Sequence, residues 1–227
     1  MEISAKRIAG LYGKMILLLL LVNLCGCEQQ QNKLTDTNKS KVPYYNTPEF
    51  TPIWTSDKNI TDTFHVISKF YFINQNGEAI NNETFKNKIY LTDFFFTRCP
   101  SICPKMTGTM KAVYENYKND PRVSFLSHSV TPEIDSVAVL KKYAISKGVD
   151  NNQWHFVTGN KNDISTIARK SYFVEQQQGF SYDSTQFLHT ENLILIDKKG
   201  HIRGLYNGTL PAEIPRIIND INGLLKE

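Results

Sequence analysis

Residues 89–96 read Ile-Tyr-Leu-Thr-Asp-Phe-Phe-Phe and form a nearly continuous apolar run. Such a run is expected of a central strand covered on both faces, because a half-exposed strand would alternate polar with apolar residues. The chain has 227 residues, of which 41% are hydrophobic and 21% are charged. That composition excludes a fully disordered chain and a protein with several membrane spans, and it allows one domain with a substantial tail.

The patterns around this strand alternate between strand and helix. Asn76-Gly77 is a strong turn signal and predicts a hairpin that joins residues 70–73 to 79–80. Apolar spacing then predicts helix at 104–118, strand at 123–127, helix at 137–144, strand at 154–157, helix at 163–170, a hairpin at 193–206 and helix at 214–225. Strands separated by helices imply parallel crossovers. We predict an α/β thioredoxin-like sandwich, in which helices flank a central mixed β-sheet with an extra N-terminal hairpin.

The N-terminus is typical of an export signal. A positively charged region precedes the apolar core at 15–22, which is too short to span a bilayer. The sequence Leu24-Cys25-Gly26-Cys27 follows and resembles the bacterial lipobox. It predicts that residues 1–26 are a signal peptide and that Cys27 is lipidated. The alternatives are an ordinary cleaved signal and an uncleaved anchor.

The stretch from Cys27 to residue 60 is polar at first and then more apolar from Tyr44 onward. We interpret it as a lipid-anchored tether in a bacterial cell envelope, on the exported (periplasmic) side of a membrane, with residues 61–227 forming the domain. The candidates to dock onto that domain are Tyr44, Tyr45, Phe50, Ile53 and Trp54. The net charge is +4 and much of it lies in the signal region, so nothing in the charge supports a nucleic-acid partner.

The most informative motif is Cys99-Pro-Ser-Ile-Cys103-Pro104, which lies between the buried strand and a helix. Proline fits an early helical position because its missing N–H costs nothing there. A thiol at a helix N-terminus favours its thiolate form, which binds metals and attacks disulfides. The alternative is a pair of inert buried cysteines, which is uncommon at such a loop.

With its aromatic strand and the following Lys-Met pair, this motif resembles that of the Sco (SenC) family of copper-binding assembly proteins. The resemblance extends over residues 64–225. It implies copper bound by Cys99, Cys103 and a third ligand, His189, which precedes the strand at 193–196. It also implies that Asp135 supports the ligands without binding copper itself.

The donor atoms of the implied ligand set suit copper better than zinc. Two thiolates and one imidazole form a soft site that suits Cu(I) and adapts to Cu(II), whereas structural zinc usually takes four ligands. The competing imidazoles are His65, His128, His155 and His201. His128 and His155 fall at strand positions typical of a core, although a strand end at His128 could face the cysteines. His201 falls in a hairpin turn, where we expect it to be solvated.

By this resemblance the protein is a metallochaperone that delivers copper to the dinuclear site of cytochrome c oxidase subunit II or a related acceptor, or prepares the thiols of that site. An upstream copper donor or a thiol reductant would be a further partner.

Three alternatives remain: a thiol–disulfide oxidoreductase, a thiol peroxidase, and a redox sensor that uses the same cysteine pair. General oxidoreductases of this fold space their cysteines more closely and place a cis-proline near them, whereas no proline occurs here between Pro132 and Pro211. Asp93 is either structural or a proton-handling carboxylate beneath the cysteines. Met106 and Met110 are expected in the core, with copper ligation as the alternative.

Overall fold

The computed structural model describes residues 42–55, 59–174 and 190–227. Their helices and strands follow the predicted order closely. In chain order they are β1 (Tyr44–Tyr45), β2 (Pro52–Ile53), β3 (Tyr71–Asn74), β4 (Ala79–Asn81), η2 (Asn82–Phe85), β5 (Ile89–Phe95), α2 (Ile102–Tyr117), β6 (Val123–Ser129), α3 (Val137–Ser146), β7 (Trp154–Thr158), α4 (Lys161–Lys170), β8 (Asn192–Ile196), β9 (Ile202–Asn207), η3 (Pro211–Glu213) and α5 (Ile214–Leu224).

The described strands form one mixed sheet in the order β2-β1-β9-β8-β5-β6-β7-β3-β4. The strand β5 lies near its centre and pairs in parallel with β6 and antiparallel with β8. Strands β5, β6, β7 and β9 therefore end at the same edge of the sheet, where β8 begins. We call this the carboxyl edge and the opposite one the amino edge. In sheets of this kind, loops at the carboxyl edge are the usual place for a site.

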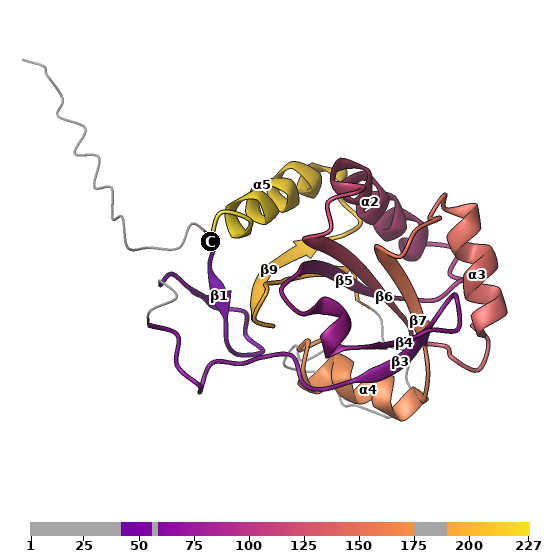
Figure 1. Ribbon diagram of the computed structural model, residues 1–227, viewed down its shortest axis with the longest axis horizontal. Coiled ribbons are helices and arrows are strands. Elements are labelled where there is room, and N and C mark those ends of the chain that lie inside the picture. Colours follow the sequence, from indigo (N-terminus) through magenta and orange to yellow (C-terminus); the bar gives the residue numbers. More distant parts are fainter. Residues whose placement is uncertain (1–41, 56–58, 175–189) are drawn as a thin grey trace, which may run out of the picture. The chain divides into compact units, whose positions relative to one another are not determined.

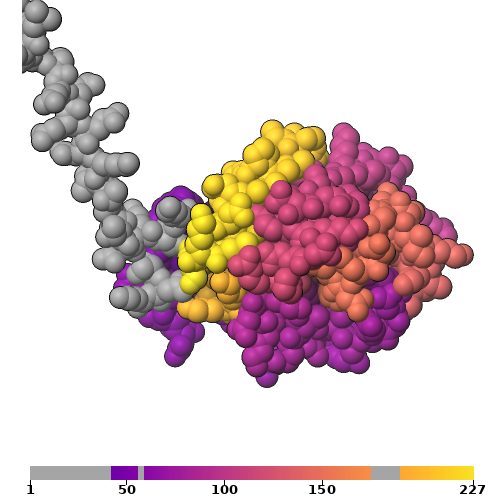
Figure 2. Space-filling view, turned by 45° about the horizontal axis from the view of Figure 1, so that its top comes forward, coloured from indigo at the N-terminus to yellow at the C-terminus, as the bar shows by residue number. Residues whose placement is uncertain are grey.

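Helices cover both faces of the sheet, as the apolar run of β5 predicts. The helices α2, α3 and α5 lie over one face and α4 lies over the other (Figure 1). Residues of β5 alternate between the two cores: Leu91 and Phe95 pack under α2, whereas Tyr90 and Phe94 pack toward α4. In the space-filling view the surface of α5 adjoins that of α2 (Figure 2).

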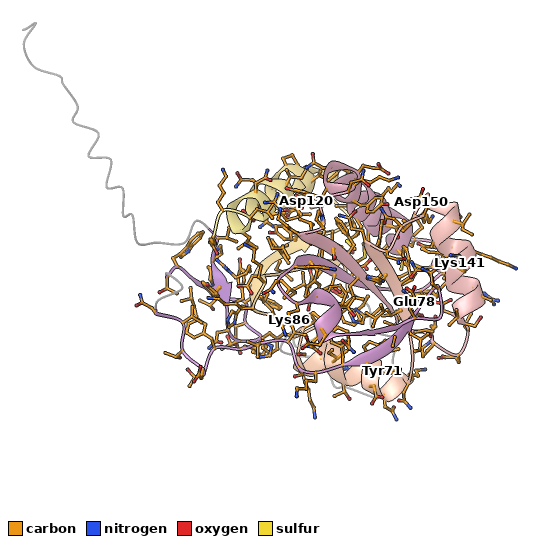
Figure 3. All side chains as sticks on the ribbon, in the orientation of Figure 1. Tyr71, Glu78, Lys86, Asp120, Lys141 and Asp150 are labelled. Atoms are coloured by element: carbon orange, nitrogen blue, oxygen red, sulfur yellow. The ribbon has the colours of Figure 1, made fainter. Side chains whose placement is uncertain are left out.

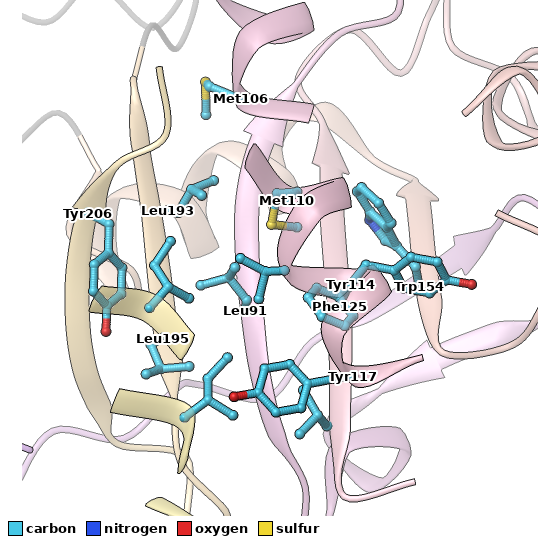
Figure 4. Close-up of a cluster of buried hydrophobic side chains, with 14 of the residues drawn as sticks. Leu91, Met106, Met110, Tyr114, Tyr117, Phe125, Trp154, Leu193, Leu195 and Tyr206 are labelled. Atoms are coloured by element: carbon cyan, nitrogen blue, oxygen red, sulfur yellow. The ribbon is translucent and has the colours of Figure 1, made fainter. Parts of the chain in front are cut away.

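The larger core contains both methionines of α2. Met106 and Met110 have no exposed surface and lie with Leu91 and Leu193 between the helix and the sheet (Figure 4). The expectation that they are core residues is confirmed. The charged side chains of Lys86, Asp120, Lys141 and Asp150 instead lie around the outside (Figure 3).

Two hairpins are confirmed, and the helices α2 and α4 begin two residues earlier than predicted, whereas α3 and α5 begin at the predicted residues. Asn76-Gly77 joins β3 to β4, and Gly77 adopts the positive φ of 79° that such a turn needs. The helix α2 starts at Ile102, so Cys103 already lies in its first turn. No helix within the described ranges is long and apolar enough to cross a membrane.

The N-terminal arm, residues 42–55, belongs to this sheet. Its strand β1 pairs with β9, and Val42 and Tyr44 are buried. A Cβ atom on Gly223 would lie only 2.9 Å from Val42 Cγ2, which shows how closely the arm approaches α5. Trp54, in contrast, keeps 50% of its surface exposed. The arm therefore docks through its first residues, before the expected domain start at residue 61.

A buried arginine fixes this arm. The guanidinium of Arg203 donates to the carbonyl oxygens of Pro43 and Val42 at 3.1 and 2.8 Å, and it stacks on the ring of Tyr44. It also pairs with Asp197 at 3.0 Å and with Glu227 at 2.8 Å. Because a buried cation is costly without such partners, these contacts hold the arm and the C-terminal residue in one place.

The expectation of a solvated His201 is wrong. Only 6% of its surface is exposed, because Tyr44 of the arm and Phe64, which follows the arm in the chain, both pack against the imidazole ring. The Nδ1 atom of His201 hydrogen-bonds the carbonyl oxygen of His65 at 2.9 Å.

Candidate functional site

The two cysteines lie at the carboxyl edge, between β5 and α2. The backbone N–H of Cys99 donates to the carbonyl oxygen of Phe96 in a turn, and Cys99 keeps a partly exposed side chain. Cys103 is buried, with 3% of its surface exposed. Its backbone N–H donates to the Sγ atom of Cys99 at 3.4 Å. Both thiols are free, so the structure shows the reduced pair.

The surroundings give the two thiols different acidities. Burial alone would raise the pKa of Cys99, but hydrogen bonds from Cys103 and from the backbone N–H groups that start α2 outweigh it and lower the pKa. Burial raises the pKa of Cys103 to about 12, and the neighbouring groups Cys99 and Asp93 add to the increase. Cys99 is therefore the more readily ionised thiol, and Cys103 keeps its proton at neutral pH.

Asp135 anchors the cysteine loop to the end of β6. Its fully buried carboxylate accepts hydrogen bonds from the backbone N–H and the hydroxyl of Thr97, at 3.1 and 2.5 Å. It also accepts from the hydroxyls of Ser129 and Thr131, at 2.7 and 3.2 Å. These four donors bind both carboxylate oxygens. The arrangement fits the expectation that Asp135 supports the site without binding metal.

Asp93 lies beneath the cysteines. Strand alternation places it on the same face as Leu91 and Phe95, toward α2. Burial raises its pKa to about 7, and a hydrogen bond with Ser127 lowers it only in part. Its Oδ1 atom has no hydrogen-bond partner among the residues that the structure describes. This placement puts the carboxyl group beside Cys103, as the interpretation of a proton-handling carboxylate beneath the cysteines requires.

The other imidazoles do not join the cysteines. His128 stacks on Phe94 with ring centroids 4.7 Å apart, on the face that α4 covers, and burial lowers its pKa to about 3. Burial also lowers the pKa of His155, to about 4. His65 binds the carbonyl oxygen of Ser171 through Nε2 at 2.7 Å. The expected core positions of His128 and His155 are confirmed.

The expected third ligand, His189, lies outside the described residues, as does Cys27. Where the chain is described again, Thr190 and Glu191 precede β8 at the carboxyl edge. The carbonyl oxygen of Glu191 accepts a hydrogen bond from Gly208 N–H just beyond the end of β9. Within the described ranges, no three histidine, cysteine or acidic side chains form a group that could hold a metal ion. A three-ligand site at this edge therefore needs a donor from another part of the chain.

The geometry also bears on the oxidoreductase alternative. The described backbone contains no cis peptide bond. General thiol–disulfide oxidoreductases of this fold carry a cis-proline beside the reactive sulfur, and that feature is missing from the part of the chain described. The paired, unequal thiols nevertheless retain the chemistry that a narrow reductase role would need.

The sequence and the structure both match known proteins of one family. The SCO1/SenC family model matches residues 58–226. The structure is similar to that of a SCO1/SenC family lipoprotein from Bacillus anthracis, with a TM-score of 0.62 and 28% identity, covering 71% of this chain and 95% of that chain.

Two further solved structures are similar. BsSco is a member of the Sco family of cytochrome c oxidase assembly proteins in which a disulfide switch has been identified. It matches with a TM-score of 0.60 and 30% identity, covering 71% and 94% of the two chains. Bradyrhizobium japonicum ScoI, solved with copper bound, matches with a TM-score of 0.55 and 25% identity, covering 70% and 99%. These neighbours confirm the thioredoxin-like α/β sandwich.

Proposed function

This chain belongs to the SCO1/SenC family, and from that premise we propose that it is an exported copper-binding metallochaperone of cytochrome c oxidase assembly. The observation that carries the proposal is the reduced pair Cys99 and Cys103 at the carboxyl edge, with the Sγ atom of Cys99 3.4 Å from the backbone nitrogen of Cys103. Two thiols on one loop and the first helical turn supply the soft sulfur donors that Cu(I) prefers.

We assign His189 as the third ligand. Support comes from the family motif and from the topology, because β8 begins at the edge where β5 ends and the cysteine loop starts. The four described imidazoles serve other contacts. An imidazole would add a donor that stabilises Cu(II) more than Cu(I), which lets the site hold either oxidation state.

The copper is cargo and is received and released at the same sulfur atoms. Cys99 ionises more readily and is partly exposed, so it is the first sulfur to meet incoming copper and the last to release it. Binding to Cys103 displaces the proton that burial holds on that thiol. We propose that the acceptor is the dinuclear copper site of cytochrome c oxidase subunit II, and that an upstream donor supplies the copper.

The unequal thiols also favour a second candidate function, reduction of the acceptor's own disulfide. In this reaction the Cys99 thiolate attacks one sulfur of the partner and forms a mixed disulfide, and the other partner sulfur leaves as a thiolate. Cys103 then loses its proton to solvent and attacks the Sγ atom of Cys99, which breaks the mixed disulfide and releases the partner's second sulfur as a thiolate. Two electrons pass to the partner, and this chain is left with a Cys99–Cys103 disulfide that an external dithiol must reduce. The disulfide switch of BsSco supports this possibility.

We further propose that the protein is held by a lipid on Cys27 at the exported side of a bacterial membrane. The lipobox-like sequence before Cys27 supports this, as does the similarity to a family lipoprotein of Bacillus anthracis. A lipid anchor keeps the copper site near a membrane-bound acceptor.

The test of copper delivery uses the mature chain with Cys27→Ser, which removes the lipidation site. The reduced protein is titrated with Cu(I) and then mixed with the apo copper domain of the subunit II of its own organism. We expect one copper per chain and its transfer to that domain. Tight binding without transfer, combined with reduction of an oxidised subunit II domain, would favour the reductase function. Absence of stoichiometric binding would disprove the metallochaperone proposal.

A further inference from the structure

The surface around Cys99 carries two cations that have no ionic partner among the residues described by the structure. Arg98 precedes the cysteine and Lys105 lies in the first turn of α2; both side chains are exposed. Neither forms an ion pair with any residue in the described part of the chain, and the first turn of α2 contains no acidic residue. The helix N-terminus adds positive potential of its own at this position.

Two other cations at the carboxyl edge are paired with carboxylates. Lys161 pairs with Glu133 at 3.2 Å, and Arg216 pairs with Glu213 at 2.6 Å. The carboxylate of Glu191, on the β8 side, accepts hydrogen bonds from Asn207 and Thr209. Arg98 and Lys105 are therefore two cations beside the thiols that have no ion pair among the described residues.

Two exposed aliphatic side chains lie at the same edge of the sheet. Ile134 follows the end of β6 and is 39% exposed, and Leu210 follows the end of β9 and is 49% exposed. Ile134 adjoins Asp135, which is bound to Thr97 in the cysteine loop. Ile134 lies on the β6 side of β5, and Leu210 lies on the other side, beyond β8. Single exposed aliphatic residues are common on protein surfaces, so their exposure alone does not indicate a binding surface. Their position at the edge that carries the thiols is what makes them relevant.

Copper can be exchanged only if the partner protein contacts this surface. A metal passes between two sets of thiols only when the donor and acceptor sulfurs can bind it together, so the partner must touch Cys99 directly. Such contact removes water from Arg98 and Lys105. Desolvating two cations is costly unless the partner places anionic groups against them.

We propose that Arg98, Lys105, Ile134 and Leu210 form a docking face that binds an acidic protein surface surrounding the partner's own copper-binding thiols. This inference rests on the proposed function, since it specifies the partner of the same site. The cations steer the encounter and pair with the partner's carboxylates, and the aliphatic residues supply the buried apolar contact that slows dissociation.

The test uses the Cu(I)-loaded mature chain with Cys27→Ser and the reduced apo copper domain of its own subunit II. The rate of copper transfer and the binding kinetics are measured across a range of ionic strength. The variant Arg98→Gln/Lys105→Gln is compared with Lys88→Gln/Lys226→Gln, which removes the same charge from the amino edge. We expect the first variant to associate at least about tenfold more slowly at low salt, with the difference lost at high salt. The control should match the wild type, and Cu(I) affinity should be unchanged in both.

A second pair of variants tests the apolar part. Ile134→Ser and Leu210→Ser should each raise the dissociation rate several-fold and leave the salt dependence unchanged. Equal slowing by the amino-edge control, or an unchanged rate in Arg98→Gln/Lys105→Gln, would overturn the docking face. If the wild type binds the domain with this salt dependence but transfers no copper, the docking face stands and copper delivery fails. If it neither binds nor transfers copper, both are overturned.

Discussion

Thr97 gives both its backbone N–H and its hydroxyl to the carboxylate of Asp135, so a residue two positions before Cys99 is fixed to the end of β6. The strand β5 is rigid because it is paired on both sides, whereas the loop after it is short and irregular. This carboxylate extends the rigid framework to the point where the thiols begin.

Asp135→Ala should therefore destabilise the protein by about 2–4 kcal/mol, because it leaves four donors without their acceptor in a buried site. It should also weaken copper binding, but less than Cys99→Ser or Cys103→Ser does. Chemical denaturation and copper titration measure the two effects. Glu133→Ala, which removes only an exposed ion pair, is the control and should cost less than about 1 kcal/mol. Equal stability of the two variants would contradict the anchoring role.

The two thiols should differ in reactivity. At neutral pH an alkylating reagent should modify Cys99 much faster than Cys103, because the pKa of Cys99 is lowered and that of Cys103 is raised to about 12. Mass spectrometry of partly modified protein identifies the residue that reacts first. The variant Cys99→Ser should make the remaining thiol slow to react, whereas Cys103→Ser should leave a fast one. Preferential labelling of Cys103 would show that the assignment is reversed.

Asp93 should make stability depend on pH. Its pKa in the folded protein is raised to about 7, so the folded state holds a proton that the unfolded state loses near pH 4. The contribution of Asp93 to the free energy of unfolding is therefore largest below pH 4. It falls by at most roughly 4 kcal/mol as the pH rises toward 7. Asp93→Asn should remove this dependence.

The buried His128 has the opposite effect: it makes the free energy of unfolding rise with pH over an overlapping pH range. Its pKa in the folded protein is lowered to about 3, so the unfolded state binds the extra proton. The quantity to measure is thus the difference in unfolding free energy between Asp93→Asn and wild type, from pH 4 to pH 8. A difference that stays constant with pH would mean that Asp93 titrates normally.

The proposed third ligand gives a prediction that separates the oxidation states. His189→Ala should weaken Cu(II) binding much more than Cu(I) binding, since sulfur dominates the affinity for Cu(I). Affinities for both ions, together with the thiolate-to-copper charge-transfer absorption, measure the change. His155→Ala is a suitable control because that imidazole lies at a strand position outside the site. Wild-type Cu(II) binding and absorption in His189→Ala would remove this residue from the ligand set.

The anchor is tested by intact-mass analysis of the membrane fraction. A lipid-modified chain that begins at Cys27 is the expected species, and Cys27→Ser should abolish the modification and release the protein from the membrane. Recovery of a chain that begins at Met1 with unmodified Cys27 would contradict the prediction.

Most of the sheet could be predicted from the sequence because its strands and helices keep regular apolar periods over five or more residues. The cysteine loop could be predicted because its residue types and spacing have few structural uses. The two residues of β1 are too short to show a period. The burial of His201 depends on that arm, which is distant in sequence, so a turn position suggested exposure instead.

The side-chain network of the site was harder to predict. Strand alternation gives the relative positions of Asp93 and Phe94 but not which of them points toward α2, because that choice is made when helices pack on the sheet. The sequence motif indicated that Asp135 has a role beside the ligands. It gave no sign that Thr97, Ser129 and Thr131 would all donate to it, since those contacts join the ends of two separate strands.

The contacts of Arg203 determine at which edge of the sheet the N-terminal arm joins the domain. They hold Val42 and Pro43 beside the first residues of β9 and the last residue of the chain, at the amino edge, whereas Cys99 and Cys103 lie at the carboxyl edge. The seven residues of β5 separate the two edges by roughly 23 Å. The segment between Cys27 and Val42 can extend over at most roughly 50 Å. A lipid at Cys27 would thus be joined to the domain at its amino edge, the edge remote from the thiols, by a segment long enough for the thiols to lie several nanometres from the bilayer.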